Sequence, residues 1–280
     1  MLKKLLPLMA VLFLVAAGCQ SGESEQVRST GEEQAEKQEE EADAGAQVDE
    51  NTSDEEDASE QADYLYEVNQ ESFTIDPMTE KANSEVALLT FDDAPDGHAV
   101  QIAEILQEHD APAIFFVNGM YLETDEGKRD LQTIHDMGFE IGNHTYSHPN
   151  LPDLSEEEQR EEIVAVNDLV EEIIGERPRF FRAPFGLNTD YTEQVTKEER
   201  MELMNWTYGY DWETEYQEPE ALADIMVNTE LLNDGANLLM HDREWTEGAV
   251  EDIVTGLRDQ GYELVDPNLI YSPEEGGQEE

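Results

Sequence analysis

Residues 86–95 read Val-Ala-Leu-Leu-Thr-Phe-Asp-Asp-Ala-Pro, a short apolar run that ends at two adjacent acids and a proline. Apolar runs of this length between turn-forming residues are typical of buried strands. Three similar runs occur further along the chain, at 113–117, 179–181 and 237–240. Each is bounded by Gly, Pro, Asn or Asp, so all four segments are predicted to be buried strands.

Helical segments lie between these runs. The clearest covers residues 155–174, where Ser155 and Glu158 form a capping box and Gly175 stops the helix. Strand and helix alternate six or seven times along the chain, which indicates an α/β protein with a parallel sheet, either open or closed into a barrel. The other predicted helices lie near 98–109, 128–137, 219–232 and 247–260.

Coordinating side chains follow several of these strands. His144 and His148 are four residues apart in a chain with only 6 histidines among 280 residues, so the pair is not expected by chance. Two imidazoles and one carboxylate leave a tetrahedral zinc ion one open position for water, which is the catalytic arrangement. At this point the alternative is a pair of surface histidines that binds no metal.

Five short segments at the ends of predicted strands occur in a definite order: residues 90–95, 144–149, 182–185, 211–212 and 239–242. In that order they closely resemble the five motifs of the polysaccharide deacetylases of the NodB-homology type, the family-four carbohydrate esterases. The resemblance spans residues 86–266. It implies an α/β fold, a distorted (β/α) barrel of about seven strands, with the active site at the C-terminal ends of the strands.

The resemblance also implies roles for individual residues. Asp92 is implied as the general base and His241 as the general acid, and Arg182 and Asp211 as their respective charge partners. A divalent metal, expected to be Zn²⁺, is implied to bind at Asp93, His144 and His148. Contacts to the substrate or the oxyanion are implied for three further residues, Phe185, Trp212 and Leu239.

These implied roles suit the hydrolysis of an amide. A bound metal polarises the acetyl carbonyl and acidifies water, so a carboxylate such as Asp92 can remove the proton. The amine is a poor leaving group until a group such as protonated His241 gives it a proton. The main-chain N–H of Phe185 would help to stabilise the oxyanion.

Three positions depart from the family pattern. Ala94 replaces the usual glycine, and if the backbone there needs a positive φ the change costs about 1 kcal/mol and could shift Asp93. Tyr208 stands where the fourth motif often has an acid. Phe185 replaces a tyrosine, which removes a phenol but keeps the main-chain donor. The five residues that carry the chemistry are all present, so an active enzyme is expected.

The resemblance therefore implies a metal-dependent hydrolase that removes N-acetyl groups from a cell-wall or extracellular polysaccharide, either peptidoglycan or a chitin-like polymer. An O-acetyl esterase acting on xylan-type polymers stays open, because the same groups can cleave an ester. A non-catalytic sugar-binding lipoprotein on the same fold is the other alternative. The presence of both Asp92 and His241 argues against it, because binding alone needs neither.

The chain is strongly acidic, with 69 Asp and Glu against 15 Lys and Arg and a formal net charge of −54. This composition excludes a nucleic-acid binder, which needs basic residues to neutralise phosphates. Residues 64–280 alone carry 52 acids and 11 bases, which predicts a halophilic protein whose repulsion is screened in a salty or alkaline medium. A single cysteine allows no intramolecular disulfide, and a monomer is expected.

Residues 1–63 are predicted to precede the folded domain. Residues 1–19 resemble a bacterial lipoprotein signal peptide, because an apolar run too short to span a bilayer ends in Ala16-Ala17-Gly18-Cys19. The resemblance implies a lipid on Cys19 that anchors the protein at the extracellular face of the cell membrane; an ordinary secreted protein is the alternative. Residues 20–63 are predicted to be an acidic disordered tether, and residues 64–280 the catalytic domain.

Overall fold

The structure, a computed structural model, describes residues 64–273. The predicted signal peptide, the lipidation site Cys19 and the acidic tether lie outside the described residues, as do residues 274–280 at the end of the predicted catalytic domain. Among residues 64–273, no helix combines the length and the apolar character that crossing a bilayer requires.

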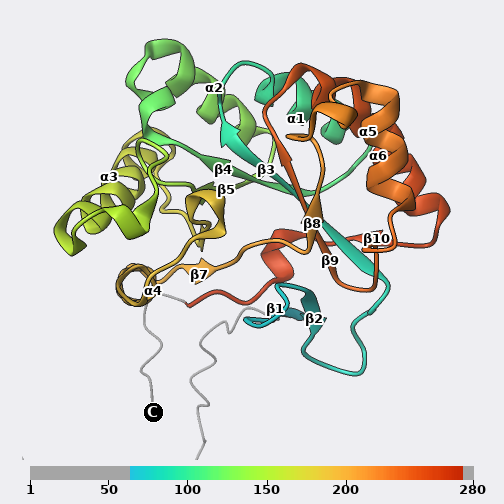
Figure 1. The fold of residues 1–280 in the computed structure, drawn as a ribbon, viewed down its shortest axis with the longest axis horizontal. Helices are drawn as coiled ribbons and strands as arrows, with labels where there is room; N and C mark the ends of the chain where they lie inside the picture. The colour runs from blue at the N-terminus through green and yellow to red at the C-terminus, as the bar shows by residue number, and fades with distance from the viewer. Residues whose placement is uncertain (1–63, 274–280) are drawn as a thin grey trace, which may run out of the picture. The chain divides into compact units, whose positions relative to one another are not determined.

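A parallel sheet forms the centre of this region (Figure 1). Its strands lie in the order β7-β6-β5-β4-β3-β9-β8 and form a half-barrel, which confirms the predicted distorted (β/α) barrel. Because neighbouring strands are parallel, their C-terminal ends meet at one edge of the sheet. The bounds are β3 (Val86–Ala94), β4 (Ala113–Val117), β5 (Glu140–Asn143), β6 (Phe180–Phe181), β7 (Glu202–Leu203), β8 (Tyr208–Gly209) and β9 (Ala236–His241).

The helices between the strands pack on one another in the same order as the strands. Along this row α4 contacts α3, α3 contacts α2, α2 contacts α1, α1 contacts α6, and α6 contacts α5. Each helix thus lies beside the strands that it connects, as in other β-α-β units. The bounds are α1 (Ala99–Glu108), α2 (Asp125–Asp136), α3 (Glu156–Ile174), α4 (Asp190–Glu198), α5 (Pro219–Asn228) and α6 (Glu244–Asp259).

The two central strands are apolar on both faces. On one face Leu89 and Phe115 belong to a cluster that also contains helical residues such as Leu106. On the other face Leu88 and Phe116 belong to a second cluster. Side chains alternate between the faces of a strand, so Thr90 and Asp92 continue the row of Leu88 along the inner face of the sheet. Thr90 and Asp92 are therefore polar side chains at the C-terminal end of a strand whose other inward-facing residues are apolar.

The strongest local signal in the sequence is found where it was predicted. Ser155 caps α3. Its side chain accepts a hydrogen bond from the backbone N–H of Glu158, and the Glu158 carboxylate accepts one from the backbone N–H of Ser155. Gly175 ends the helix with φ 84°, a conformation that glycine adopts without strain. The prediction of a helix over residues 155–174 is confirmed.

Several helix bounds differ from the prediction. The helix predicted over 219–232 ends at Asn228, because Thr229 is already extended with ψ 147°. Helix α2 begins at Asp125, three residues early, because Thr124 caps it by accepting a hydrogen bond from the N–H of Gly127. Helix α6 likewise begins at Glu244 instead of 247.

Four of the elements were not predicted from the sequence: three strands and one helix. Strands β1 (Tyr66–Val68) and β2 (Ile75–Pro77) form an antiparallel pair, and the two-residue strand β10 (Glu263–Leu264) pairs with the start of β3. Helix α4 begins with a capping box between Thr189 and Thr192, which uses threonine where Glu or Gln is usual. The three strands have only two or three residues each, and the partner of β10 is distant in the sequence.

Candidate active site

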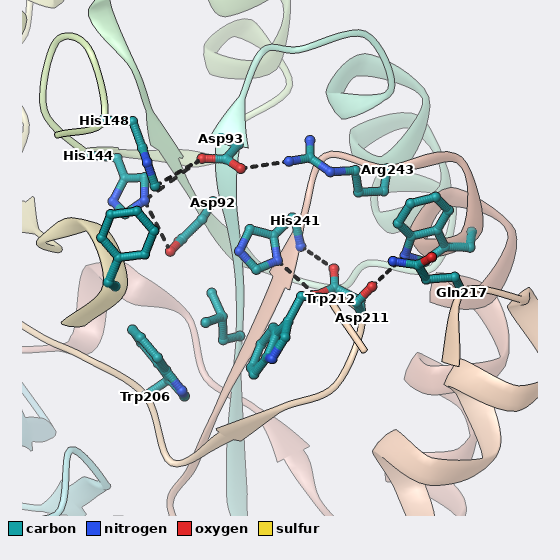
Figure 2. A pocket seen from close by; sticks show the side chains of 13 residues that line it. Asp92, Asp93, His144, His148, Trp206, Asp211, Trp212, Gln217, His241 and Arg243 are labelled. Atoms are coloured by element: carbon teal, nitrogen blue, oxygen red, sulfur yellow. Dashed lines mark hydrogen bonds and ion pairs between the residues drawn. The ribbon is translucent and has the colours of Figure 1, made fainter. Parts of the chain in front are cut away.

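The strand ends converge on a pocket of about 610 Å³ (Figure 2). Asp92 and Asp93 lie at the end of β3, and Leu239 and His241 belong to β9. The remaining lining residues come from the segments that follow β5, β6, β7, β8 and β9, and Trp245 comes from α6. Among the site residues predicted from the sequence, all but Arg182 line this pocket. Its lining residues are Asp92, Asp93, His144, His148, Phe185, Trp206, Asp211, Trp212, Gln217, Leu239, His241, Arg243 and Trp245.

Asp93, His144 and His148 form a candidate metal site. One ligand atom from each lies within 4.8 Å of the other two. Oδ1 of Asp93 is 3.5 Å from Nε2 of His148 and 3.9 Å from Nε2 of His144. Ligands placed about 2.0–2.1 Å from a tetrahedral zinc ion are roughly 3.4 Å apart, so this spacing fits such an ion. The fold thus brings together the three predicted ligands.

The surroundings of His144 suit a metal ligand. Its Nδ1 lies 2.7 Å from the backbone oxygen of Arg182, an acceptor, so the ring hydrogen belongs on Nδ1 and the lone pair of Nε2 is directed to the site. Burial lowers the pKa of His144, although the charges of Asp92 and Asp93 oppose this effect. A neutral imidazole is the form that binds a metal ion.

Asp92 is paired with an arginine beneath the pocket. Nη1 of Arg182 lies 2.7 Å from Oδ1 of Asp92, and the two side chains are 0% and 2% exposed. Oδ2 of Asp92 lies 3.5 Å from Nε2 of His144. Arg182 therefore occupies one oxygen of this carboxylate, and the other oxygen faces the metal site.

Arg182 is held by further acceptors that the sequence analysis did not identify. Nη1 also donates to Oγ1 of Thr90, and Nη2 donates to the backbone oxygen of Asn205 and to Oδ1 of Asn237. Burial lowers the pKa of this guanidinium, but Asp92 opposes the effect, and an arginine stays protonated in proteins. A buried charge with this many partners is fixed in both position and orientation.

His241 is paired with Asp211 on the other side of the pocket. Its Nδ1 lies 2.7 Å from Oδ1 of Asp211, and Oδ2 of Asp211 accepts hydrogen bonds from the backbone N–H of His241 and from Oγ1 of Thr246. Burial alone lowers the pKa of His241, but the hydrogen bond and charge of Asp211 outweigh it, so the pKa is raised above its ordinary value. The imidazole therefore keeps its proton to a higher pH, as a general acid requires.

Unusual backbone conformations gather around the metal site. Asp93, Thr145, His148 and Phe185 have φ values of 61°, 69°, 56° and 60°, in the left-handed region that few residues other than glycine adopt. Such conformations cost free energy and concentrate at functional sites, where the surrounding contacts hold them. Two of the predicted metal ligands, Asp93 and His148, are therefore held in strained backbone conformations.

The replacement of glycine at Ala94 is accommodated without strain. The positive φ in this motif belongs to Asp93 and not to Ala94. The Ala94 side chain is fully buried in the core, and its backbone oxygen accepts a hydrogen bond from the N–H of Asn118. The expected cost of a left-handed alanine therefore does not arise.

The aromatic residues near the fourth motif serve two different purposes. Trp206 and Trp212 line the pocket with ring centroids 6.5 Å apart. The buried Tyr208 instead donates a hydrogen bond to the backbone oxygen of Met226 and packs against Tyr210. Tyr208 therefore does not replace the missing acid in the pocket.

Four lining residues were not predicted from the sequence: Trp206, Gln217, Arg243 and Trp245. Arg243 could have been noticed, because it lies two residues after His241 in a chain where basic residues are scarce. Gln217 and Trp245 are part of no motif and carry no comparable signal. The histidines assigned no role, His98, His109 and His135, lie beside Glu247, Glu251 and Glu176 respectively, outside this pocket.

Comparison with known proteins agrees with this geometry. The family model described as Polysaccharide deacetylase matches residues 79–204, which include the candidate metal site and Arg182. Peptidoglycan-N-acetylmuramic acid deacetylase PdaC of Bacillus subtilis is 34% identical over 200 residues, which is 69% of this chain and 39% of that protein. The chain thus spans well under half of the length of that relative.

Two further matches are informative in different ways. A peptidoglycan-N-acetylglucosamine deacetylase of Bacillus cereus is 30% identical over 202 residues, which cover 69% of this chain and 70% of that protein. A solved structure described as a CE4 family pseudoenzyme from Bacillus anthracis is 31% identical with a TM-score of 0.60, covering 66% of this chain and 64% of that one. Given these similarities and the site at the strand ends, this chain belongs to the polysaccharide deacetylase family, the CE4 carbohydrate esterases.

Proposed function

We propose that this chain is a metal-dependent deacetylase that removes N-acetyl groups from amino sugars of a cell-wall or extracellular polysaccharide. The strongest support for this proposal is the arrangement of Asp92 and His241. Asp92 and His241 are register partners on the neighbouring strands β3 and β9, and each has a counter-charge 2.7 Å away, Arg182 for Asp92 and Asp211 for His241. A site with a base and an acid prepared in this way is suited to proton transfer, which sugar binding alone does not need.

The residues divide the chemistry between them. A divalent metal held by Asp93, His144 and His148 would polarise the acetyl carbonyl and acidify water, and zinc is the proposed ion. Asp92 takes the proton of the attacking water through Oδ2, because Arg182 already occupies Oδ1. His241 gives a proton to the departing amine, since Asp211, together with the charges of Asp92 and Asp93, outweighs burial and raises the pKa of the imidazole.

The aromatic residues beside these polar groups suit an acetylated sugar, because Phe185 packs against His148 and Trp212 against His241. Phe185 and Trp212 are 61% and 46% exposed, so both rings offer apolar faces for stacking on a sugar. Leu239 lies deeper in the wall and is buried. We assign Leu239 and Trp212 to the acetyl methyl group and the backbone N–H of Phe185 to the oxyanion.

The names of the relatives favour peptidoglycan as the substrate. The Bacillus subtilis and Bacillus cereus relatives are named for deacetylation of N-acetylmuramic acid and N-acetylglucosamine in peptidoglycan. Because the two relatives are named for different sugars of the same polymer, the proposal extends to peptidoglycan and not to one of its two sugars. We also propose that a lipid on Cys19 holds the protein at the outer face of a bacterial membrane, within reach of that polymer.

A sugar-binding protein without catalysis is a second candidate, because the similar Bacillus anthracis structure is described as a pseudoenzyme. Acetate release would separate the two. The full chain, loaded with Zn²⁺ and with its metal content measured, is incubated with peptidoglycan, chitooligosaccharides and acetylated xylan. We expect acetate from one of the N-acetylated polymers, and much less from the Asp92→Asn variant.

Other outcomes point elsewhere. Acetate from xylan alone would identify an O-acetyl esterase. Binding of a polymer by the metal-loaded chain without any acetate release would instead favour the non-catalytic candidate.

A further inference from the structure

Arg243 lies beside Asp93, on the side of that residue away from His144 and His148 (Figure 2). It is the residue that precedes α6, and its Nη2 is 2.7 Å from Oδ2 of Asp93. The other oxygen of the same carboxylate, Oδ1, is the one that faces His144 and His148. Asp93 is therefore contacted by a cation through one oxygen and by the two imidazoles through the other.

The arginine itself is fixed at its second nitrogen. Nη1 of Arg243 donates to the backbone oxygen of Asp242 at 2.7 Å and lies 3.3 Å from Oδ2 of Asp96. A planar guanidinium that is held at both of its terminal nitrogens, Nη1 and Nη2, has little freedom to rotate. Its contact with Asp93 is therefore set by the surrounding loop and not only by the carboxylate.

That loop has its own anchor. The carboxylate of Asp242, which is 2% exposed, accepts hydrogen bonds from the backbone N–H groups of Asp96, Gly97 and His98. These three residues follow Asp93 closely in the chain. Asp242 thereby ties the end of β9 to the loop after β3, so Arg243 and Asp93 are mounted on connected segments.

We propose that Arg243 is a positioning residue that makes Asp93 a one-oxygen metal ligand. This inference rests on the metal site of the proposed function. With Oδ2 occupied by Arg243, Asp93 presents Oδ1 alone, and the metal keeps a coordination position for water or the acetyl oxygen. Hydrogen-bond partners of metal ligands commonly control affinity in this way, and their loss costs about 10- to 100-fold.

Two other roles for Arg243 predict different results. As a cation in the pocket wall it could bind an acidic group of a substrate, but two carboxylates, those of Asp93 and Asp96, already lie against its guanidinium. As a purely structural residue it would only stabilise the start of α6. Metal affinity separates these roles, because only a positioning role lowers the affinity when the arginine is removed.

The experiment compares the metal affinity of four variants of the full chain with that of the wild type. Each protein is stripped of metal and titrated with Zn²⁺ against a competing chelator. We expect Arg243→Gln to weaken Zn²⁺ binding by about 10- to 100-fold and Arg243→Lys to fall between this variant and the wild type. Loss of a nearby positive charge by itself strengthens the binding of a cation, so weaker binding identifies a loss of orientation.

Two controls match these variants. Arg258→Gln removes the same charge from the last turn of α6, where Arg258 donates to the backbone oxygens of His109 and Asp110, away from the pocket. Asp96→Asn removes the longer of the two Nη1 contacts of Arg243 but leaves the backbone oxygen of Asp242, which holds the same nitrogen, and the contact of Nη2 with Asp93. Both should bind Zn²⁺ within about threefold of the wild type, well inside the effect expected for Arg243.

The outcomes distinguish the inference from the function beneath it. If the wild type does not bind Zn²⁺, the proposed metal site itself fails. If the wild type binds but Arg243→Gln binds equally well or more tightly, Arg243 does not position Asp93. A higher KM for peptidoglycan at unchanged Zn²⁺ affinity would assign Arg243 to the substrate instead. If Arg243→Gln has a lowered melting temperature without metal, the Zn²⁺ affinity of the Arg243→Lys variant tests the positioning role instead.

Discussion

Nδ1 of His241 lies 2.7 Å from Oδ1 of Asp211, a residue that is itself 1% exposed. Asp211 comes from the loop after β8 and His241 from the end of β9, so the pair bridges two neighbouring strands. Burial alone lowers the pKa of this imidazole, and the hydrogen bond and charge of Asp211, with smaller contributions from Asp92 and Asp93, raise it above its ordinary value.

The high-pH limb of activity should therefore depend on Asp211. A general acid is lost as the pH rises through its pKa, and the pKa of His241 is raised in the wild type. In Asp211→Asn the opposing charge is gone and burial remains, so the pKa of His241 falls and the limb moves to lower pH. The profile of kcat/KM from about pH 5 to 10 measures this shift. An unmoved limb would remove His241 from the role of acid.

Removal of a metal ligand should abolish metal and activity together. In His144→Ala one imidazole and one carboxylate remain, and such a two-ligand site binds metal poorly. The measurement is metal content per chain after dialysis, together with acetate release. His98→Ala is the matched control, because His98 pairs with Glu247 outside the pocket and should keep both properties. Stoichiometric zinc in His144→Ala would show that the ligand assignment is wrong.

The proposed base and acid should affect rate without affecting metal content. Asp92→Asn and His241→Ala are each expected to lower kcat by roughly 10²- to 10⁴-fold, the usual effect of losing a positioned proton-transfer group. Metal content and kcat are measured on the same preparations. Loss of metal from Asp92→Asn would make Asp92 a ligand, and an unchanged kcat would exclude either residue from the mechanism.

The same Asp92→Asn change should lower stability, because it leaves the buried guanidinium of Arg182 without its counter-charge. Removing one partner of a buried ion pair costs about 3 kcal/mol or more in the free energy of unfolding. Chemical denaturation of the metal-free protein measures this cost. A loss below about 1 kcal/mol would show that the ion pair of Asp92 with Arg182 contributes little to stability.

The anchor can be tested through the cysteine. If Cys19 carries a lipid, Cys19→Ser should move the protein from the membrane fraction to the medium of a bacterial host. Immunoblotting of both fractions gives the result, with the wild type alongside. Retention of Cys19→Ser in the membrane fraction would mean that something other than this lipid holds the protein there.

High salt should stabilise the protein. Residues 64–280 carry 52 acids and 11 bases, and the Debye length falls from about 30 Å at 0.01 M to about 3 Å at 1 M salt. Repulsion among the excess acids is therefore nearly screened at high salt, and compaction becomes easier. We expect the melting temperature of the zinc-loaded chain to rise between about 0.05 and 2 M NaCl. A flat or falling melting temperature would reject salt adaptation but leave the enzymatic proposal intact.

The central strands and the longest helix were predictable because their signals are local. A run of buried residues such as 113–117 and a capping box such as Ser155 with Glu158 are complete within a few positions. The end of α5 and the strands β1 and β10 were not predictable in this way. Strand β1 has only three residues, and the end of α5 is set by the extended backbone of Thr229. Strand β10 depends on a partner far along the chain, because it pairs with Val86 and Ala87.

The amino-acid sequence by itself determined which chemical groups follow the strands: two acids after one strand, two histidines after another, and one histidine at the end of a third. Parallel strands bring such ends together, so the composition of the pocket could be inferred. The family resemblance implied Arg182 as the partner of Asp92, but only the tertiary structure decided which group Asp93 faces. Asp92 and Asp93 are adjacent in the chain, yet Arg182 pairs with the first and Arg243 with the second. The φ of 61° at Asp93 and contacts across 90 and 150 residues set this difference, and neither is a property of the local sequence.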